Sequence, residues 1–168
     1  QEGYPPLRIG PPQQFGKTSR QVRIHGGTSS QFLSALLMIG PCLPDGLELI
    51  PEGDLVSRPY LEMTLQLMRH FGAQADWQGE HIVVEPGAYT PKKFTVEADW
   101  SAASYWYAMA ALAQSPDIRL KGLFANSWQG DAVLSRMMQS FGIQTVFEET
   151  GIHLKASGIA PRPVFEWN

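Results

Sequence analysis

The sequence predicts an α/β (α+β) protein built from two β-α-β-α-β-β units, with helices buried inside and sheets outside. Two landmarks recur seventy residues later: Phe71-Gly72 as Phe141-Gly142, and Leu67-Met68 as Met137-Met138. The first helix expected in each unit has no polar stripe, which predicts burial nearly all round. The strands alternate apolar and polar residues, so each sheet should expose one face to water. This layer order inverts the doubly wound fold, whose helices cover a buried parallel sheet.

The chain divides into three segments. Residues 1–20 are rich in proline and glycine and can hold one short strand, Leu7-Arg8-Ile9. Residues 21–94 form the first repeat unit, and residues 95–168 form the second. The second unit ends in Val164 to Asn168, which resembles the start of a further strand. Because the sequence also begins at Gln1 without a methionine, we expect it to be a piece of a longer protein.

Composition excludes several classes of protein. Of the 168 residues, 43% are hydrophobic and 17% are charged, which argues against a disordered chain. The net charge is −3 with no basic block, so neither nucleic acid nor a membrane surface is an expected partner. The single cysteine, Cys42, excludes a disulfide framework and a thiolate zinc site. No apolar run approaches the roughly 20 residues of a membrane span. We therefore expect a soluble cytoplasmic protein without metal or cofactor.

The first unit reads as six elements. Val22 and Ile24 alternate in a strand, and residues 29–42 follow as the buried helix. A second strand around Leu47 and Leu49 leads through a loop into an amphipathic helix at 59–71. Gly72 is expected at the C-terminal end of that helix. The last two strands, 73–77 and 81–85, pair around Gln78-Gly79.

The second unit repeats this order. A strand at 94–96 precedes a helix at 101–113 that is apolar on every side. A strand containing Ile118 and Leu120 is followed by the loop 126–130 and an amphipathic helix at 131–141. Two further strands, 143–147 and 151–155, complete the unit.

The sharpest local motif is Gly26-Gly27-Thr28-Ser29-Ser30-Gln31, between the first strand and its buried helix. Glycines allow a close approach of the backbone to a ligand, and Thr28 or Ser29 is a natural helix N-cap. Helical amides and hydroxyls at this end can hold a phosphate without many lysines. The alternative reading is an ordinary capped helix, because serine N-caps are common.

A second motif precedes the amphipathic helix. Pro59 fits the first helical turn, and Ser57 can cap it. With Arg58 and Tyr60, Ser57 could complete an anion site in the same unit. The alternative is capping plus a surface ion pair. The counterpart in the second unit, Asn126 to Asp131, lacks the basic and phenolic groups.

Other residues carry weaker signals. The four histidines lack metal-ligand spacing and read as solvated or core residues: His25, His70, His81 and His153. Cys42 reads as an inert buried thiol, and Asp99 as the N-cap of the second buried helix. The run Tyr105-Trp106-Tyr107 is expected to pack in the core or between units.

Four segments together resemble the 5-enolpyruvylshikimate-3-phosphate synthase family. They are SSQFLSALLM (29–38), GDLVSRPY (53–60), VEADWSAASY (96–105) and QGD (129–131). The resemblance covers essentially the whole chain in order, and Tyr4 to Ile9 fits the segment that precedes these motifs. It implies transfer of the enolpyruvyl group of phosphoenolpyruvate to the 5-hydroxyl of shikimate 3-phosphate, on the route to aromatic amino acids. It also implies inside-out domains of three such units each, and a full-length enzyme that is a monomer.

The resemblance also implies roles for five residues. Ser29 and Ser30 match the serines that hold the 3-phosphate, and Ser57 matches a third hydroxyl there. Gln31 matches the glutamine that lies against the shikimate ring, and Tyr60 the tyrosine that helps to hold shikimate 3-phosphate. The family's catalytic aspartate and basic residues have no counterpart here, so we expect no catalytic residue in this chain and no activity from it alone.

Two rival interpretations stay open from the sequence. One is the related UDP-N-acetylglucosamine enolpyruvyl transferase, which the serine motif and the pair Ser57 and Tyr60 disfavour. The other is a non-catalytic anion-binding repeat module.

Overall fold

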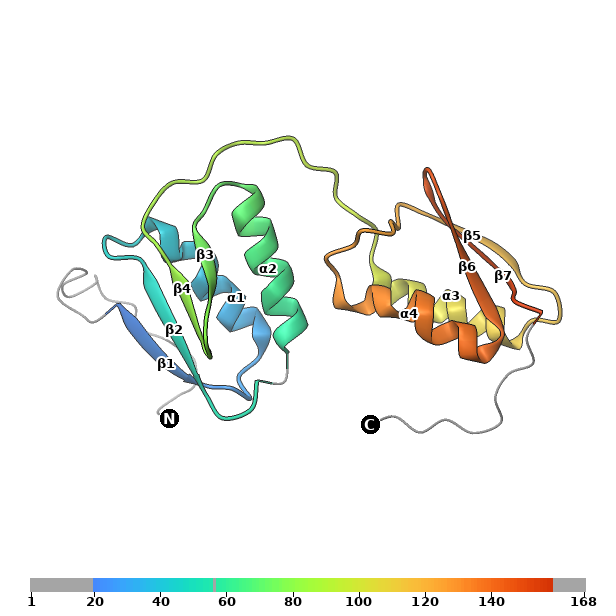
Figure 1. Cartoon of the computed structure of the whole chain (residues 1–168), viewed down its shortest axis with the longest axis horizontal. Coiled ribbons are helices and arrows are strands. Elements are labelled where there is room, and N and C mark those ends of the chain that lie inside the picture. Colours follow the sequence, from blue (N-terminus) through green and yellow to red (C-terminus); the bar gives the residue numbers. More distant parts are fainter. Residues whose placement is uncertain (1–19, 56, 159–168) are drawn as a thin grey trace, which may run out of the picture. The chain divides into compact units, whose positions relative to one another are not determined.

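The computed structural model describes residues 20–55 and 57–158 (Figure 1). The strands expected at Leu7-Arg8-Ile9 and from Val164 lie outside these residues. The chain forms two compact units, Gln1–Arg58 with Leu67–Pro91, and Pro59–Gln66 with Lys92–Asn168. The unit boundary between residues 94 and 95 stays a prediction.

The first sheet is mixed, in the order β1-β2-β4-β3. Its strands are β1 (Gln21–His25), β2 (Leu47–Glu52), β3 (Ala75–Gln78) and β4 (His81–Val84). β1 runs parallel to β2 with Val22 opposite Leu49, and β4 pairs antiparallel with both β2 and β3. A parallel pair needs a crossover, which α1 (Ser30–Ile39) and a 3₁₀ turn at Gly40–Cys42 supply.

Small and apolar residues bring α1 onto this sheet. Leu33 and Leu37, one turn apart, are completely buried. A β-carbon on Gly40 would lie 2.9 Å from the Val84 side chain, so the end of the helix passes close to β4. Helix α2 (Arg58–His70) buries Leu61, Leu65 and Met68, which lie on one face as its amphipathic pattern predicts.

The second sheet is antiparallel, in the order β5-β7-β6. Its strands are β5 (Asp117–Lys121), β6 (Ile143–Glu148) and β7 (Gly151–Ala156). Helix α3 (Trp100–Leu112) covers it, with Trp100 and Tyr107 fully buried beside Ile152 and Leu154. The Tyr107 hydroxyl hydrogen-bonds Thr145 at 2.7 Å, which satisfies the one polar atom that this ring takes into the core.

The two sheets share a strand order. β2-β4-β3 in the first corresponds to β5-β7-β6 in the second, and each last pair is a hairpin. The glycines at the matching landmarks, Gly72 and Gly142, have left-handed φ values of 91° and 81°. Only glycine adopts this conformation readily, which explains the glycine after each phenylalanine.

Two expected elements differ in the structure. Residues 94–96 form no strand, and Val96 is 82% exposed. Alternation predicts a half-buried strand but cannot show whether a partner edge is available. The helix expected at 131–141 is broken into a 3₁₀ turn at Gly130–Val133, α4 (Leu134–Met137) and a 3₁₀ turn at Met138–Phe141. Ser135 Oγ donates to the Ala132 carbonyl at 2.8 Å, a local bond that competes with helical pairing.

Burial of the two apolar helices is one-sided in this chain, contrary to the prediction. On α1, Phe32, Met38 and Ile39 are at least 49% exposed, and on α3 Tyr105, Met109 and Leu112 are at least 52% exposed. A helix that is apolar on all sides is stabilised by burial on all sides, but it is buried only where a neighbouring element covers it. Cys42 is exposed rather than buried, because it ends a 3₁₀ turn after α1. Across residues 20–55 and 57–158, no helix has the length and apolarity to cross a membrane.

Candidate functional site

The first unit brings two helix-start segments to one sheet edge. β1 and β2 are parallel, and His25 pairs with Glu52 at their carboxyl ends. The Gly26 N–H then donates to the Glu52 carbonyl at 2.8 Å. The turn 26–29 before α1 and residues 53–55 after β2 therefore lie together at this edge, where parallel sheets commonly bind ligands.

Hydrogen bonds shape the turn before α1. Thr28 N donates to the His25 carbonyl at 2.9 Å, and Gly27 N donates to His25 Nδ1 at 3.1 Å. Ser29, one of the two predicted candidates, is the N-cap, and its Oγ accepts from Gln31 N at 3.4 Å. That capping bond is long, so the Ser29 hydroxyl is only weakly engaged. Ser29 and Gln31 are exposed and Ser30 is half-buried.

Ser57 stands at the start of α2. It occupies the N-cap position but makes no capping hydrogen bond through its side chain, contrary to the expectation that it caps the helix. Pro59 lies in the first turn, as predicted. Tyr60 is 49% exposed, and its carbonyl accepts from Thr64 Oγ1 at 2.9 Å.

Arg58 does not point to an open anion site. Its guanidinium carbon lies 4.3 Å from the centroid of the Trp77 ring, a cation–π contact with β3. A cavity of about 160 Å³ beside this contact is lined by Arg58, Trp77 and two acidic residues, Asp54 and Glu80, among others. Two carboxylates against one guanidinium disfavour an anion in this cavity. The candidate phosphate position is therefore the hydroxyl-bearing turn before α1.

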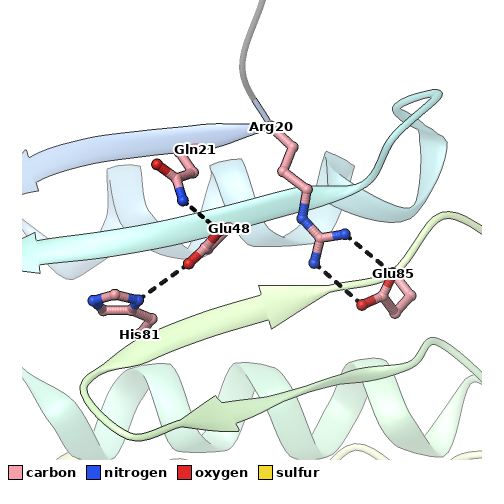
Figure 2. Close-up of polar contacts among 5 residues, drawn as sticks. All are labelled: Arg20, Gln21, Glu48, His81 and Glu85. Atoms are coloured by element: carbon pink, nitrogen blue, oxygen red, sulfur yellow. Dashed lines mark hydrogen bonds and ion pairs between the residues drawn. The ribbon is translucent and has the colours of Figure 1, made fainter.

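A polar network lies on the sheet face away from the helices (Figure 2). Glu48 on β2 accepts from Gln21 Nε2 at 2.9 Å and contacts His81 Nδ1 at 3.1 Å. These interactions, the Gln21 bond first, lower the pKa of the Glu48 carboxyl. Arg20 pairs with Glu85 at 3.2 Å across the same face. The network links three strands and takes no part in the helix-start edge.

The histidines expected to be solvated or in the core have protein partners. His153 is 2% exposed and lies between two carboxylates, Asp117 and Glu148. His81 contacts Glu48, and His70 packs edge-on against Phe71. In the part of the chain that the structure describes, no three histidine, cysteine or acidic residues are grouped to hold a metal ion.

Two residues of the second unit have a structural role that the sequence pattern does not predict. Glu97 and Gln129 join the start of α3 to the loop after β5 through several hydrogen bonds. Both fall within the segments that carry the family resemblance, yet no spacing rule points to a carboxylate and an amide thirty-two residues apart. Asp99, also there, caps α3 as predicted by accepting from Ser101 N at 2.8 Å.

The fold and the edge define an α/β protein with a hydroxyl-rich candidate anion site at the start of a helix. The model of the EPSP synthase (3-phosphoshikimate 1-carboxyvinyltransferase) family matches residues 1–165. The chain therefore belongs to the EPSP synthase family.

Relatives named 3-phosphoshikimate 1-carboxyvinyltransferase come from several organisms. One from Bacteroides fragilis is 50% identical over 158 residues, 94% of this chain and 38% of the relative. One from Escherichia coli is 40% identical over 145 residues, 84% of this chain and 33% of the relative. One from Methanothermobacter thermautotrophicus is 35% identical over 156 residues, 93% and 36% of the two chains. The chain thus spans between 33% and 38% of the length of these relatives.

Proposed function

We propose that this chain is part of an enzyme that transfers the enolpyruvyl group of phosphoenolpyruvate to the 5-hydroxyl of shikimate 3-phosphate, with release of phosphate. The family match over residues 1–165 and the shared name of the relatives support this reaction. Both substrates are small anions, so the protein must supply hydrogen-bond donors or positive charge to hold them.

Ser29, Ser30 and Ser57 hold the 3-phosphate in this proposal. The observation that carries it is the register of β1 and β2, which places the starts of α1 and α2 at one edge. Ser29 is weakly engaged by its cap, and Ser57 makes no cap bond, so both hydroxyls can donate to an anion. The amides of the first turn of α1 and the positive end of its dipole add to the attraction.

Gln31 and Tyr60 complete the substrate contacts. Gln31 lies one residue inside α1 and is exposed, so its amide can reach a ring hydroxyl of a ligand held at Ser29. Tyr60, a half-exposed phenol on α2, is assigned to shikimate 3-phosphate on the family resemblance. Neither side chain carries charge, so we assign them to orientation rather than to chemistry.

The apolar faces left exposed on α1 and α3 are covered in the longer protein. We assign the chain two β-α-β-α-β-β repeats, an assignment supported by the common strand order and the paired glycines. Further units packed on the exposed faces would enclose both helices and leave the sheets outside. We expect that longer protein to be a monomeric cytoplasmic enzyme without a cofactor.

The test compares the 168-residue chain with the complete protein that contains it. Phosphate release from phosphoenolpyruvate is measured with and without shikimate 3-phosphate. We expect turnover that depends on both substrates from the complete protein and none from the 168-residue chain. Turnover by the short chain would contradict the assignment of the catalytic groups to other segments. A complete protein inactive with shikimate 3-phosphate would contradict the reaction itself.

A further inference from the structure

The Glu97 carboxylate is a hydrogen-bonding centre of the second unit. Its Oε1 accepts from the indole Nε1 of Trp100 at 2.8 Å and from the main-chain N of Phe124 at 2.9 Å. Its Oε2 accepts from Ser127 Oγ at 2.6 Å and from Gln129 Nε2 at 3.0 Å. Each oxygen therefore receives two donors, which is the full capacity of a carboxylate.

The four donors are all neutral. Within residues 20–55 and 57–158, no lysine, arginine or histidine lies within ion-pair distance of Glu97. Hydrogen bonds to a charged acceptor are roughly twice as strong as bonds between neutral groups. Four neutral donors around one negative charge are typical of an anion-binding site. Here the anion is the carboxylate of Glu97, a residue of the chain itself.

Gln129 fixes the geometry of this site. Its Nε2 also donates to the Ala98 carbonyl at 2.8 Å, and its Oε1 accepts from Trp100 N at 2.9 Å. Its main-chain N donates to Ser127 Oγ at 3.0 Å, which orients that hydroxyl toward Glu97. Gln129 therefore holds the first residue of α3 through its side chain and the Ser127 hydroxyl through its main chain.

The loop after β5 is anchored at one end by Leu123, which is buried in the core. Residues 123–129 form neither helix nor strand, and the strand expected at 94–96 does not form. The Ala98 N–H donates to the Gly122 carbonyl at 2.8 Å, as Gly26 does to Glu52 in the first unit. Besides that bond and the stacking of Phe94 on Trp128, the contacts of Glu97 and Gln129 join the residues before α3 to the loop.

We propose that Trp100, Phe124, Ser127 and Gln129 form a small-anion site whose built-in ligand is the Glu97 carboxylate, and that a free monocarboxylate such as formate can replace it. The internal anion sets the conformation of residues 97–100 and 123–129. In the first unit, by contrast, the substrate would supply the anion, and this comparison rests on the proposed phosphate site. The Glu97 site does not rest on it, because all its contacts lie within the second unit.

The test removes the carboxylate and offers a free one. In the Glu97→Ala protein, hydrogen exchange at the Phe124 amide and at the Trp100 indole should accelerate at least about tenfold, as expected for loss of a charged hydrogen bond. Sodium formate should restore much of the protection, whereas sodium chloride at the same ionic strength should not. Glu149→Ala, which removes an exposed carboxylate from the β6–β7 turn, should behave as the unchanged protein.

Two results would overturn the proposal. One is unchanged exchange at both groups in Glu97→Ala, and the other is equal protection by formate and chloride. Should Glu97→Ala fail to fold, Glu97→Gln keeps the shape and removes the charge. We then expect native circular dichroism with about fivefold faster exchange at both groups, because both donate to Oε1 and this acceptor loses its charge. Unaltered exchange at both would reject the site. Neither readout depends on enzyme turnover, so failure here leaves the proposed reaction untouched.

Discussion

The main-chain N–H of Gly26 donates to the carbonyl of Glu52 at 2.8 Å, one residue beyond the pairing of His25 with Glu52. This bond ties the turn before α1 to the end of β2. The backbones approach so closely that a β-carbon on Gly26 would lie 2.6 Å from the Asp54 carbonyl oxygen. The close packing of the backbone at the edge that carries the candidate site therefore requires a glycine at position 26.

Replacing that glycine should damage the edge. Gly26→Ala places a methyl group against main-chain atoms that cannot rotate away, so we expect a loss of about 1–3 kcal/mol in the free energy of unfolding. Gly87→Ala is the matched control, because no heavy atom lies within 4 Å of its β-carbon position. It should stay within about 0.5 kcal/mol of the parent in urea unfolding. Equal losses in both variants would contradict the close approach.

The two side-chain caps should differ in strength. Asp99 accepts from Ser101 N at 2.8 Å, whereas Ser29 accepts from Gln31 N at 3.4 Å. Asp99→Ala should therefore cost about 1 kcal/mol, and Ser29→Ala clearly less, when each is measured by denaturant unfolding. Asp45→Ala, at an exposed position, controls for loss of a carboxylate. A larger loss from Ser29→Ala would mean that its cap is stronger than its geometry indicates.

Arg58 should contribute to stability rather than to anion affinity. Its contact with Trp77 is partly exposed, so Arg58→Ala should lower the free energy of unfolding by about 0.5–1 kcal/mol. The affinity of the complete protein for shikimate 3-phosphate, measured by calorimetry, should change by less than about twofold, or about 0.4 kcal/mol. A loss of tenfold or more would place the guanidinium in the anion site.

Asp117 should make the protein sensitive to acid. The hydrogen bond with His153, aided by nearby positive charge, lowers the pKa of Asp117 below its ordinary value of 3.8. A carboxyl whose pKa is lower in the folded state stabilises that state above the unfolded pKa, and this contribution is lost as the pH falls through the folded pKa. Asp117→Asn should therefore lower the Tm near neutral pH and approach the parent's Tm below 3.8. A Tm difference that stays constant with pH would contradict this role.

Periodicity predicted most of the elements, because strands and helices of these units differ clearly in apolar spacing. Val22 and Ile24 mark β1, and Leu61, Leu65 and Met68 mark the buried face of α2. Burial of the helix side chains was less predictable, because it depends on neighbouring elements that the sequence of the helix does not specify. Phe32 and Met109 are apolar yet exposed in this chain.

The sequence predicted only part of the candidate site. A cap at Thr28 or Ser29 follows from their place before an apolar helix, and in the structure Ser29 is the N-cap. The engagement of Arg58 with Trp77 joins residues nineteen positions apart, and a basic residue beside a serine predicts an anion site equally well. The role of Glu97 is not predictable from the sequence for a similar reason, since three of its four partners come from a loop without a recognisable pattern.

In the proposed site, Ser29 and Ser30 hold the phosphate of the substrate. Calorimetric titration of shikimate 3-phosphate, and separately of shikimate, into the complete protein and its Ser29→Ala/Ser30→Ala variant tests it directly. Ser115→Ala, in an exposed loop, serves as the control. Because two hydrogen bonds to a charged group are lost, affinity for shikimate 3-phosphate should fall by about 100-fold or more, with little change for shikimate. Equal binding of shikimate 3-phosphate by the variant and the parent would contradict the phosphate assignment.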